Sequence, residues 1–126
     1  MAGQRHLKTV RATQGRQRTR AKAIAPDIEA MVNRIVNQFH PERIILFGSR
    51  ARGDARPDSD VDFLVVMPVP DSKARQETLI GVALHDFAVA KDIVVSTPEE
   101  YAWRKDIIGT IEYPATEEGA VVYVRS

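Results

Sequence analysis

The chain has 126 residues, no cysteine and a formal net charge of +1. A chain of this length forms one domain, and the lack of cysteine excludes disulfides, zinc–thiolate sites and thiol nucleophiles. No apolar run reaches membrane-spanning length, and the N-terminus has no signal-peptide apolar core. We therefore expect a cytoplasmic protein with no membrane partner.

The charge is divided unevenly along the chain. Residues 1–25 hold seven Lys or Arg and no acid, whereas the remainder holds eleven Lys or Arg against seventeen Asp or Glu, a balance of −6. The first 25 residues are polar and lack a hydrophobic period, so we expect a disordered basic tail before a domain at residues 26–126. Nucleic acid is not an expected partner except through this tail, and there the lack of aromatic residues among the basic ones weakens the case for base stacking.

The first predicted elements are a helix and two strands. A helix begins near Pro26 and ends before Pro41. Residues 44–47 and 61–67 read as buried strands, joined by a loop at residues 50–59 that contains glycine and proline. A helical crossover does not fit between strands about a dozen residues apart, so we predict that they pair antiparallel.

The second half of the chain continues with alternating helices and strands. We predict a helix over residues 72–90, a short strand over 92–95 and a helix from Thr97, where a capping box combines with proline. A helical stretch through Glu118 and an edge strand over residues 121–124 follow. The predicted inner face of the 72–90 helix is Leu79, Ala83, Phe87 and Ala90. The fold class is then α+β, a small mixed or antiparallel sheet with helices packed on one face.

The most informative stretch covers residues 43–66, RIILFGSRARGDARPDSDVDFLVV. It places Gly48 and Ser49 after one apolar run, and Asp60 and Asp62 at the start of the next. Because side chains alternate faces along a strand, the two aspartates point the same way. Carboxylates about 4 Å apart repel by roughly 1–4 kcal/mol, and hard divalent ions such as Mg²⁺ or Mn²⁺ offset this repulsion.

The turn itself suits phosphate. Ser49 offers a hydroxyl, the turn offers backbone N–H groups, and Gly48 leaves the backbone open to close approach. Together the turn and the two carboxylates predict a nucleotide–metal site. The alternative is an acidic surface loop that groups Asp54, Asp58 and Asp60.

Further candidates stand beside this motif. Asp92 starts the third predicted strand and is either a third metal ligand or a turn cap, with Asp86 the lesser candidate. Arg50 and Arg52 either grip a triphosphate or are solvated loop residues. Tyr101 and Trp103 follow a helix start and read as core, although an exposed aromatic there would suit a partner contact.

The Gly-Ser, ten-residue spacer and Asp-x-Asp pattern resembles the signature of the DNA polymerase β-type nucleotidyltransferase superfamily. Within it, the chain is similar to minimal nucleotidyltransferase (MNT) domains that act as antitoxins beside HEPN-family toxins. The resemblance covers roughly residues 27–124, and it implies the polymerase β-type nucleotidyltransferase fold. It also implies a metal-dependent enzyme that transfers AMP from ATP to a tyrosine hydroxyl of a HEPN toxin partner.

The resemblance assigns roles to the candidate residues. Asp60 and Asp62 would hold two Mg²⁺ ions, with Mn²⁺ as an alternative, and Asp92 would hold the catalytic ion. Gly48, Ser49, Arg50 and Arg52 are the expected triphosphate-binding residues. Two other interpretations stay open: a subunit of a small-molecule nucleotidyltransferase of the aminoglycoside type, and a non-catalytic antitoxin that occludes its toxin.

Overall fold

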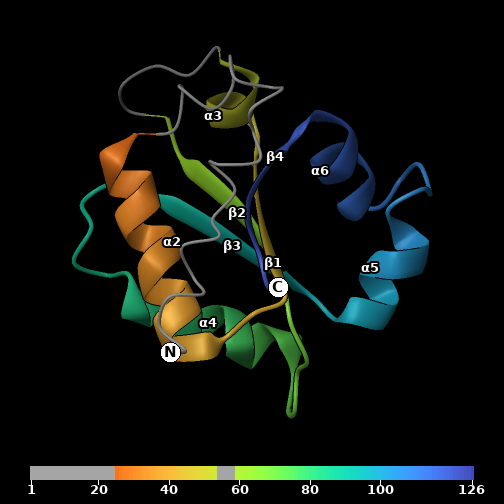
Figure 1. Ribbon diagram of the computed structural model, residues 1–126, viewed down its shortest axis with the longest axis horizontal. Helices are drawn as coiled ribbons and strands as arrows, with labels where there is room; N and C mark the ends of the chain where they lie inside the picture. The colour runs from red at the N-terminus through yellow and green to blue at the C-terminus, as the bar shows by residue number, and fades with distance from the viewer. Residues whose placement is uncertain (1–24, 54–58) are drawn as a thin grey trace.

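The computed structural model describes residues 25–53 and 59–126 (Figure 1). The predicted basic tail falls on residues 1–25, of which residues 1–24 lie outside the described part, so its disorder stays a prediction. The described chain opens with helix α2, Pro26–Phe39, which begins at the predicted proline. Within the described residues no helix is both long enough and apolar enough to cross a membrane.

A four-stranded mixed sheet forms the centre of the molecule, in the order β3-β2-β1-β4. Its strands are β1 (Arg43–Phe47), β2 (Val61–Val66), β3 (Lys91–Ser96) and β4 (Ala120–Val124). β1 pairs antiparallel with both β2 and β4, and β2 pairs parallel with β3. The predicted antiparallel pair, the neighbouring third strand and the final edge strand are therefore confirmed.

Five helices accompany the sheet within the described ranges, and the α+β fold class is confirmed. After α2 they are α3 (Ser49–Arg52), α4 (Lys73–Ala83), α5 (Pro98–Arg104) and α6 (Glu112–Glu118). The loop predicted from residue 50 is wrong at its start, because α3 occupies residues 49–52 and ends at Gly53 in the left-handed conformation. The predicted 72–90 helix is too long, since α4 ends at Ala83.

Helices cover both faces of the sheet, not one as predicted. Phe63 of β2 packs in the cluster that includes α2 and α4, whereas Leu64 packs with Ala115 of α6. Figure 1 shows α2 and α4 on one side of the sheet, and α5 and α6 on the other. The physical reason lies in β2, whose residues 63–66 are all buried, because a strand that is apolar on both faces needs cover on both.

Helix α4 presents a different face to the core from the predicted one. Gln76 and Ile80 are its buried residues, and Leu84 follows as its buried cap, whereas Leu79 is 42 % exposed. The predicted face failed because it extended the helical period to residue 90, beyond the point where the helix ends. Phe87 still packs on the core cluster, but from the connection that leads to β3.

Candidate active site

Three aspartates lie at the edge of the sheet where β2 and β3 begin. Asp62 and Asp92 are paired positions in the parallel register of β2 and β3, so their side chains leave the same face. Asp60 stands two residues before Asp62 and is exposed. Val61 and Phe63 are fully buried on the opposite face, as the alternation predicts. The structure thus places Asp62 beside Asp92 on neighbouring strands, with Asp60 two residues before Asp62.

The surroundings of Asp62 shift the pKa of its carboxyl. Burial raises the pKa of the Asp62 carboxyl above its usual value, and the negative charges of Asp92 and then Asp60 raise it further. The positive charge of Arg52 acts in the other direction and lowers that pKa. Asp62 therefore lies within electrostatic reach of both other aspartates and of Arg52 at one edge of the sheet.

Gly48 joins the two halves of the motif. β1 ends at Phe47, whose partner across the sheet is Asp62, and the chain then turns at Gly48 with φ 77° and ψ −160°. A Cβ atom on Gly48 would lie 2.1 Å from Oδ2 of Asp62, so no other residue fits without displacing that carboxylate. Gly48 is therefore needed for the close approach of the Asp62 carboxylate, whereas the predicted approach of a phosphate stays a prediction.

Ser49 opens α3 directly after Gly48, which is the N-cap residue of that helix. The first N–H groups of a helix have no acceptor within it, so this turn can donate to an anion. Ala51 is buried in the main core and holds α3 against the sheet. The predicted phosphate-binding turn therefore adjoins the carboxylates.

The two arginines of α3 have different surroundings. Arg50 donates hydrogen bonds from Nε and Nη2 to the backbone carbonyl oxygen of Ser59, at 3.3 and 2.9 Å. Arg52 acts on Asp62 through its charge. The lesser candidate Asp86 forms an ion pair with Arg34 of α2, which lowers the pKa of Asp86, and it is not among the charges that act on Asp62.

The donor set suits a hard divalent ion. Three carboxylates supply oxygen ligands of the kind that Mg²⁺ and Mn²⁺ prefer, and the turn at Gly48 leaves space beside Asp62 that a side chain would fill. Across residues 25–53 and 59–126, no three His, Cys, Asp or Glu side chains are close enough to enclose an ion together. The acidic-loop alternative involves Asp54 and Asp58, which lie outside these ranges.

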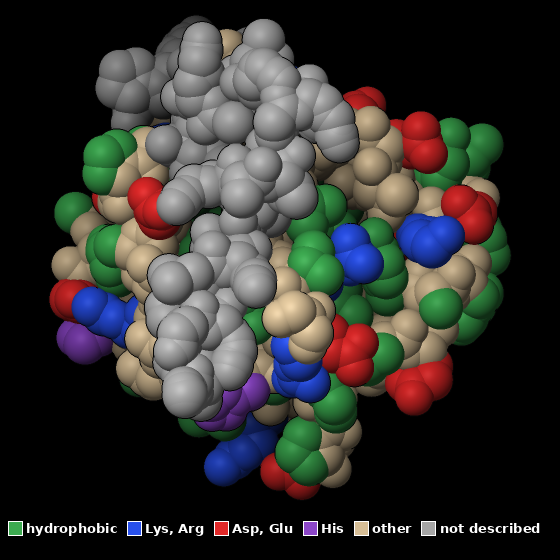
Figure 2. Space-filling view, viewed as in Figure 1, with side chains coloured by type: hydrophobic (Ala, Val, Ile, Leu, Met, Phe, Trp, Pro, Cys, Tyr) green, Lys and Arg blue, Asp and Glu red, His purple; other side chains and the backbone are tan. Residues whose placement is uncertain are grey.

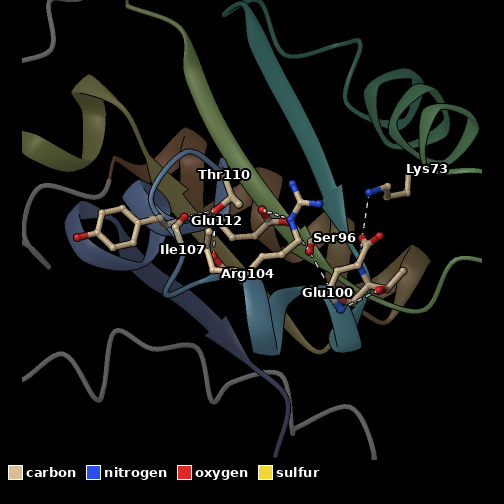
Figure 3. A network of polar contacts seen from close by, with 9 residues as sticks. Lys73, Ser96, Glu100, Arg104, Ile107, Thr110 and Glu112 are labelled. Atoms are coloured by element: carbon tan, nitrogen blue, oxygen red, sulfur yellow. Dashed lines mark hydrogen bonds and ion pairs between the residues drawn. The ribbon is translucent and has the colours of Figure 1, made fainter.

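A second polar cluster lies at the other end of β3 (Figure 3). Oε2 of Glu112 accepts a hydrogen bond from the Ser96 hydroxyl at 2.8 Å, and Oε1 accepts one from Nε of Arg104 at 3.0 Å. Glu112 is only 2 % exposed. The Thr110 hydroxyl contacts the carbonyl oxygen of Arg104 and accepts from the N–H of Tyr113, which ties α5 to α6. No motif or short spacing in the sequence signals this cluster.

The α5–α6 side of the molecule carries exposed apolar side chains. Figure 2 shows hydrophobic and charged side chains mixed over this side. The exposed large hydrophobic residues of the segment are Trp103, Ile107, Ile108 and Ile111. Trp103 is 59 % exposed, so its interpretation as a core residue is wrong, whereas Tyr101 packs on the second core cluster.

Comparisons with known proteins identify the family of the domain. The family described as "Nucleotidyltransferase domain" matches residues 29–115, a stretch that includes Gly48, Asp60, Asp62 and Asp92. The chain is also 36 % identical over 55 residues to a Methanocaldococcus jannaschii protein named "Putative protein adenylyltransferase MJ0141". That match covers 44 % of this chain and 54 % of the relative, so the chain spans about half the relative's length.

Proposed function

Because the chain belongs to the nucleotidyltransferase domain family, we propose that it transfers AMP from ATP to a tyrosine hydroxyl of a partner protein. The observation that carries this proposal is the placement of Asp62 and Asp92 at paired positions of neighbouring strands, with Gly48 against Asp62. Such a group provides oxygen ligands for metal beside donors for phosphate. Nucleotidyl transfer needs both at one place.

The residues divide the work according to their positions. Asp60, Asp62 and Asp92 would hold divalent ions, which supply positive charge to the triphosphate and to the attacking oxygen. Ser49 and the N–H groups of the turn would bind the β- and γ-phosphates, and Arg52 would add a positive charge. The acceptor oxygen bonds to the α-phosphorus as the bond to the β-phosphate oxygen breaks, and pyrophosphate leaves. Asp92, which is exposed, would take the proton of the acceptor hydroxyl.

The proposed partner is a HEPN-family toxin, which would make this protein an antitoxin. The printed name of the relative, a protein adenylyltransferase, supports a protein acceptor. The motif resemblance supports the toxin pairing. Residues 26–126 carry a charge of −6, which favours encounter with a basic ribonuclease surface.

Co-expression with a HEPN toxin encoded beside this chain tests the proposal. The toxin should gain the mass of one AMP, and it should stay inactive after this protein is removed. Asp60→Ala/Asp62→Ala should abolish the mass gain and the protection. Asp86→Ala is the matched control, because Asp86 is an aspartate that pairs with Arg34 away from the site.

The same experiment detects inhibition by occlusion. In that case the double variant protects as well as the wild type, the toxin mass is unchanged, and the toxin regains activity once separated. Protection without a change in mass would refute the proposed reaction.

A further inference from the structure

Arg50 links the two parts of the motif that are far apart in sequence. Its guanidinium belongs to α3, directly after the Gly48 turn, and its hydrogen bonds reach the carbonyl oxygen of Ser59. Ser59 is the residue immediately before Asp60. The contact therefore spans nine positions and connects the phosphate-binding turn to the segment that carries the first carboxylate.

The bonded carbonyl restricts Asp60 through the geometry of the peptide bond. The carbonyl of Ser59 and the N–H of Asp60 belong to one planar group, so fixing the oxygen fixes the whole plane. On the other side of Asp60, the N–H of Val61 donates to the carbonyl oxygen of Ala90 at 2.9 Å. Asp60 is thus held at both of its peptide bonds, although its side chain is exposed.

The helix that carries Arg50 is itself fixed. Ala51 is 4 % exposed and packs in the main core, and the N–H groups of Ala51 and Arg52 both donate to the carbonyl oxygen of Gly48. The Arg50 guanidinium therefore extends from a fixed helix and can hold the Ser59 carbonyl in one position. Its planar fork of donors suits a contact from two nitrogen atoms, which a lysine cannot reproduce.

We infer that Arg50 is a positioning residue, which holds Asp60 in place for divalent-metal binding by fixing the Ser59 carbonyl, and that it is not a triphosphate-binding residue. This inference deepens the proposed function and rests on it. The two roles of Arg50 differ in when they matter. A phosphate-binding arginine acts only when nucleotide is present, whereas a residue that positions Asp60 affects the metal site in the absence of nucleotide.

The sign of the effect separates position from charge. Removing a positive charge near three carboxylates makes the site more negative, which by itself tightens cation binding. Loss of the Ser59 contact frees the segment before Asp60 and weakens cation binding, because ligands must then be ordered when the ion binds. The two explanations therefore predict opposite changes for Arg50→Gln.

Mn²⁺ titration of the full chain at pH 8, without nucleotide and without partner, tests the inference. We expect Arg50→Gln and Arg50→Lys each to weaken Mn²⁺ binding by at least about fivefold, close to 1 kcal/mol. Arg52→Gln is the comparison for charge alone, since it removes a neighbouring positive charge that acts on Asp62, and it should tighten Mn²⁺ binding. The backbone amide resonance of Asp60 should shift in both Arg50 variants, and thermal melting should show that the variants remain folded.

Other outcomes would overturn the inference. Wild-type Mn²⁺ affinity for Arg50→Lys, or tighter binding for Arg50→Gln, would show that Arg50 acts through its charge. Unchanged Mn²⁺ binding together with weakened ATP binding would restore the triphosphate-binding interpretation. Because these titrations use no partner, a failure to modify the toxin would count against the proposed acceptor and leave the role of Arg50 to be decided by the metal data.

Discussion

A carboxylate lies near each end of β3 on the same face of the sheet, and the two carboxylates have different electrostatic surroundings. At the far end, Glu112 is buried, and its two oxygens accept hydrogen bonds from Ser96 and Arg104 (Figure 3). At the near end, burial raises the pKa of Asp62, and the like charges of Asp92 and Asp60 raise it further. Glu112 has its hydrogen-bond partners within the protein, whereas Asp62 is partly buried with two like charges close to it.

This difference distinguishes a structural carboxylate from a candidate ligand. A buried charge with complete hydrogen bonding holds elements together, here β3, α5 and α6. A cluster of like charges costs stability when it is left alone, so its presence suggests that a cation or substrate completes it. Removal of the Asp62 carboxylate should therefore lower activity and not stability, whereas removal of the Glu112 carboxylate should lower stability.

The largest expected effect is on activity at the near end. Asp62→Ala should lower the proposed AMP transfer by at least about a thousandfold, roughly 4 kcal/mol, because it removes a proposed metal ligand. The same change should leave the melting temperature unchanged or higher, because it relieves repulsion from Asp92 and Asp60. Transfer assays and thermal melting measure both. A variant that melts lower and keeps its activity would reverse the assignment of this end.

The next largest effect is on stability at the far end. Glu112→Ala should destabilise the fold by about 3 kcal/mol, because it leaves the Ser96 hydroxyl and the Arg104 guanidinium without their acceptor. The melting temperature should fall by more than about 10 °C. Glu117→Ala is the matched control, since Glu117 is an exposed residue of the same helix. Mn²⁺ binding by the folded fraction of Glu112→Ala should equal that of the wild type.

A smaller effect concerns the exposed apolar side chains of the α5–α6 segment. Trp103→Ala should weaken binding to the proposed toxin by about tenfold, because a tryptophan that is 59 % exposed has apolar surface available to a partner. Mn²⁺ and ATP binding should not change. Glu99→Ala, at an exposed position of the same helix, controls for nonspecific effects. Equal toxin affinity for Trp103→Ala and the wild type would place the docking surface elsewhere.

The smallest expected effect is a pH dependence that belongs to Asp62. Its pKa is raised in the folded protein, so its contribution favours folding most below the unfolded value of 3.8 and is lost as the pH rises through the folded pKa. The stability of the wild type relative to Asp62→Asn should therefore fall as the pH rises from 4 to 7. Arg34 and Lys73 lower the pKa values of Asp86 and Glu100, so the contributions of these two residues to stability rise with pH. These contributions are the same in both proteins and cancel in the difference. Urea unfolding of the wild type and Asp62→Asn at several pH values measures this difference in stability.

The near end was largely predictable from the sequence because local rules determine it. Alternation along a strand places Asp60 and Asp62 on one side and Val61 in the core, and a short connection requires the antiparallel pairing of β1 and β2. The pairing of Asp62 with Asp92 follows once β3 lies beside β2. What the sequence missed here is the contact from Arg50 to Ser59, since a solvated arginine has the same sequence signature.

The far end was not predictable because tertiary contacts determine it. Glu112 has partners 8 and 16 residues away, and no short spacing signals them. The cover of the second sheet face by α6 depends on the same packing, and it escaped prediction although β2 is apolar on both faces. The prediction of the inner face of α4 was wrong for a simpler reason. It included residues beyond Ala83, where the helix ends, and so placed the apolar face incorrectly.

An assay with ATP labelled at either the α- or the γ-phosphorus tests the central claim, the proposed transfer of AMP, most directly. With Mg²⁺ and the purified partner, ATP labelled at the α-phosphorus should label the partner, and ATP labelled at the γ-phosphorus should release its label as pyrophosphate. Asp62→Ala should abolish the α-label, and Asp86→Ala should retain it. Transfer of the γ-label would identify a kinase reaction, and labelling by Asp62→Ala at the wild-type rate would show that the acidic end of the sheet is not the site of chemistry.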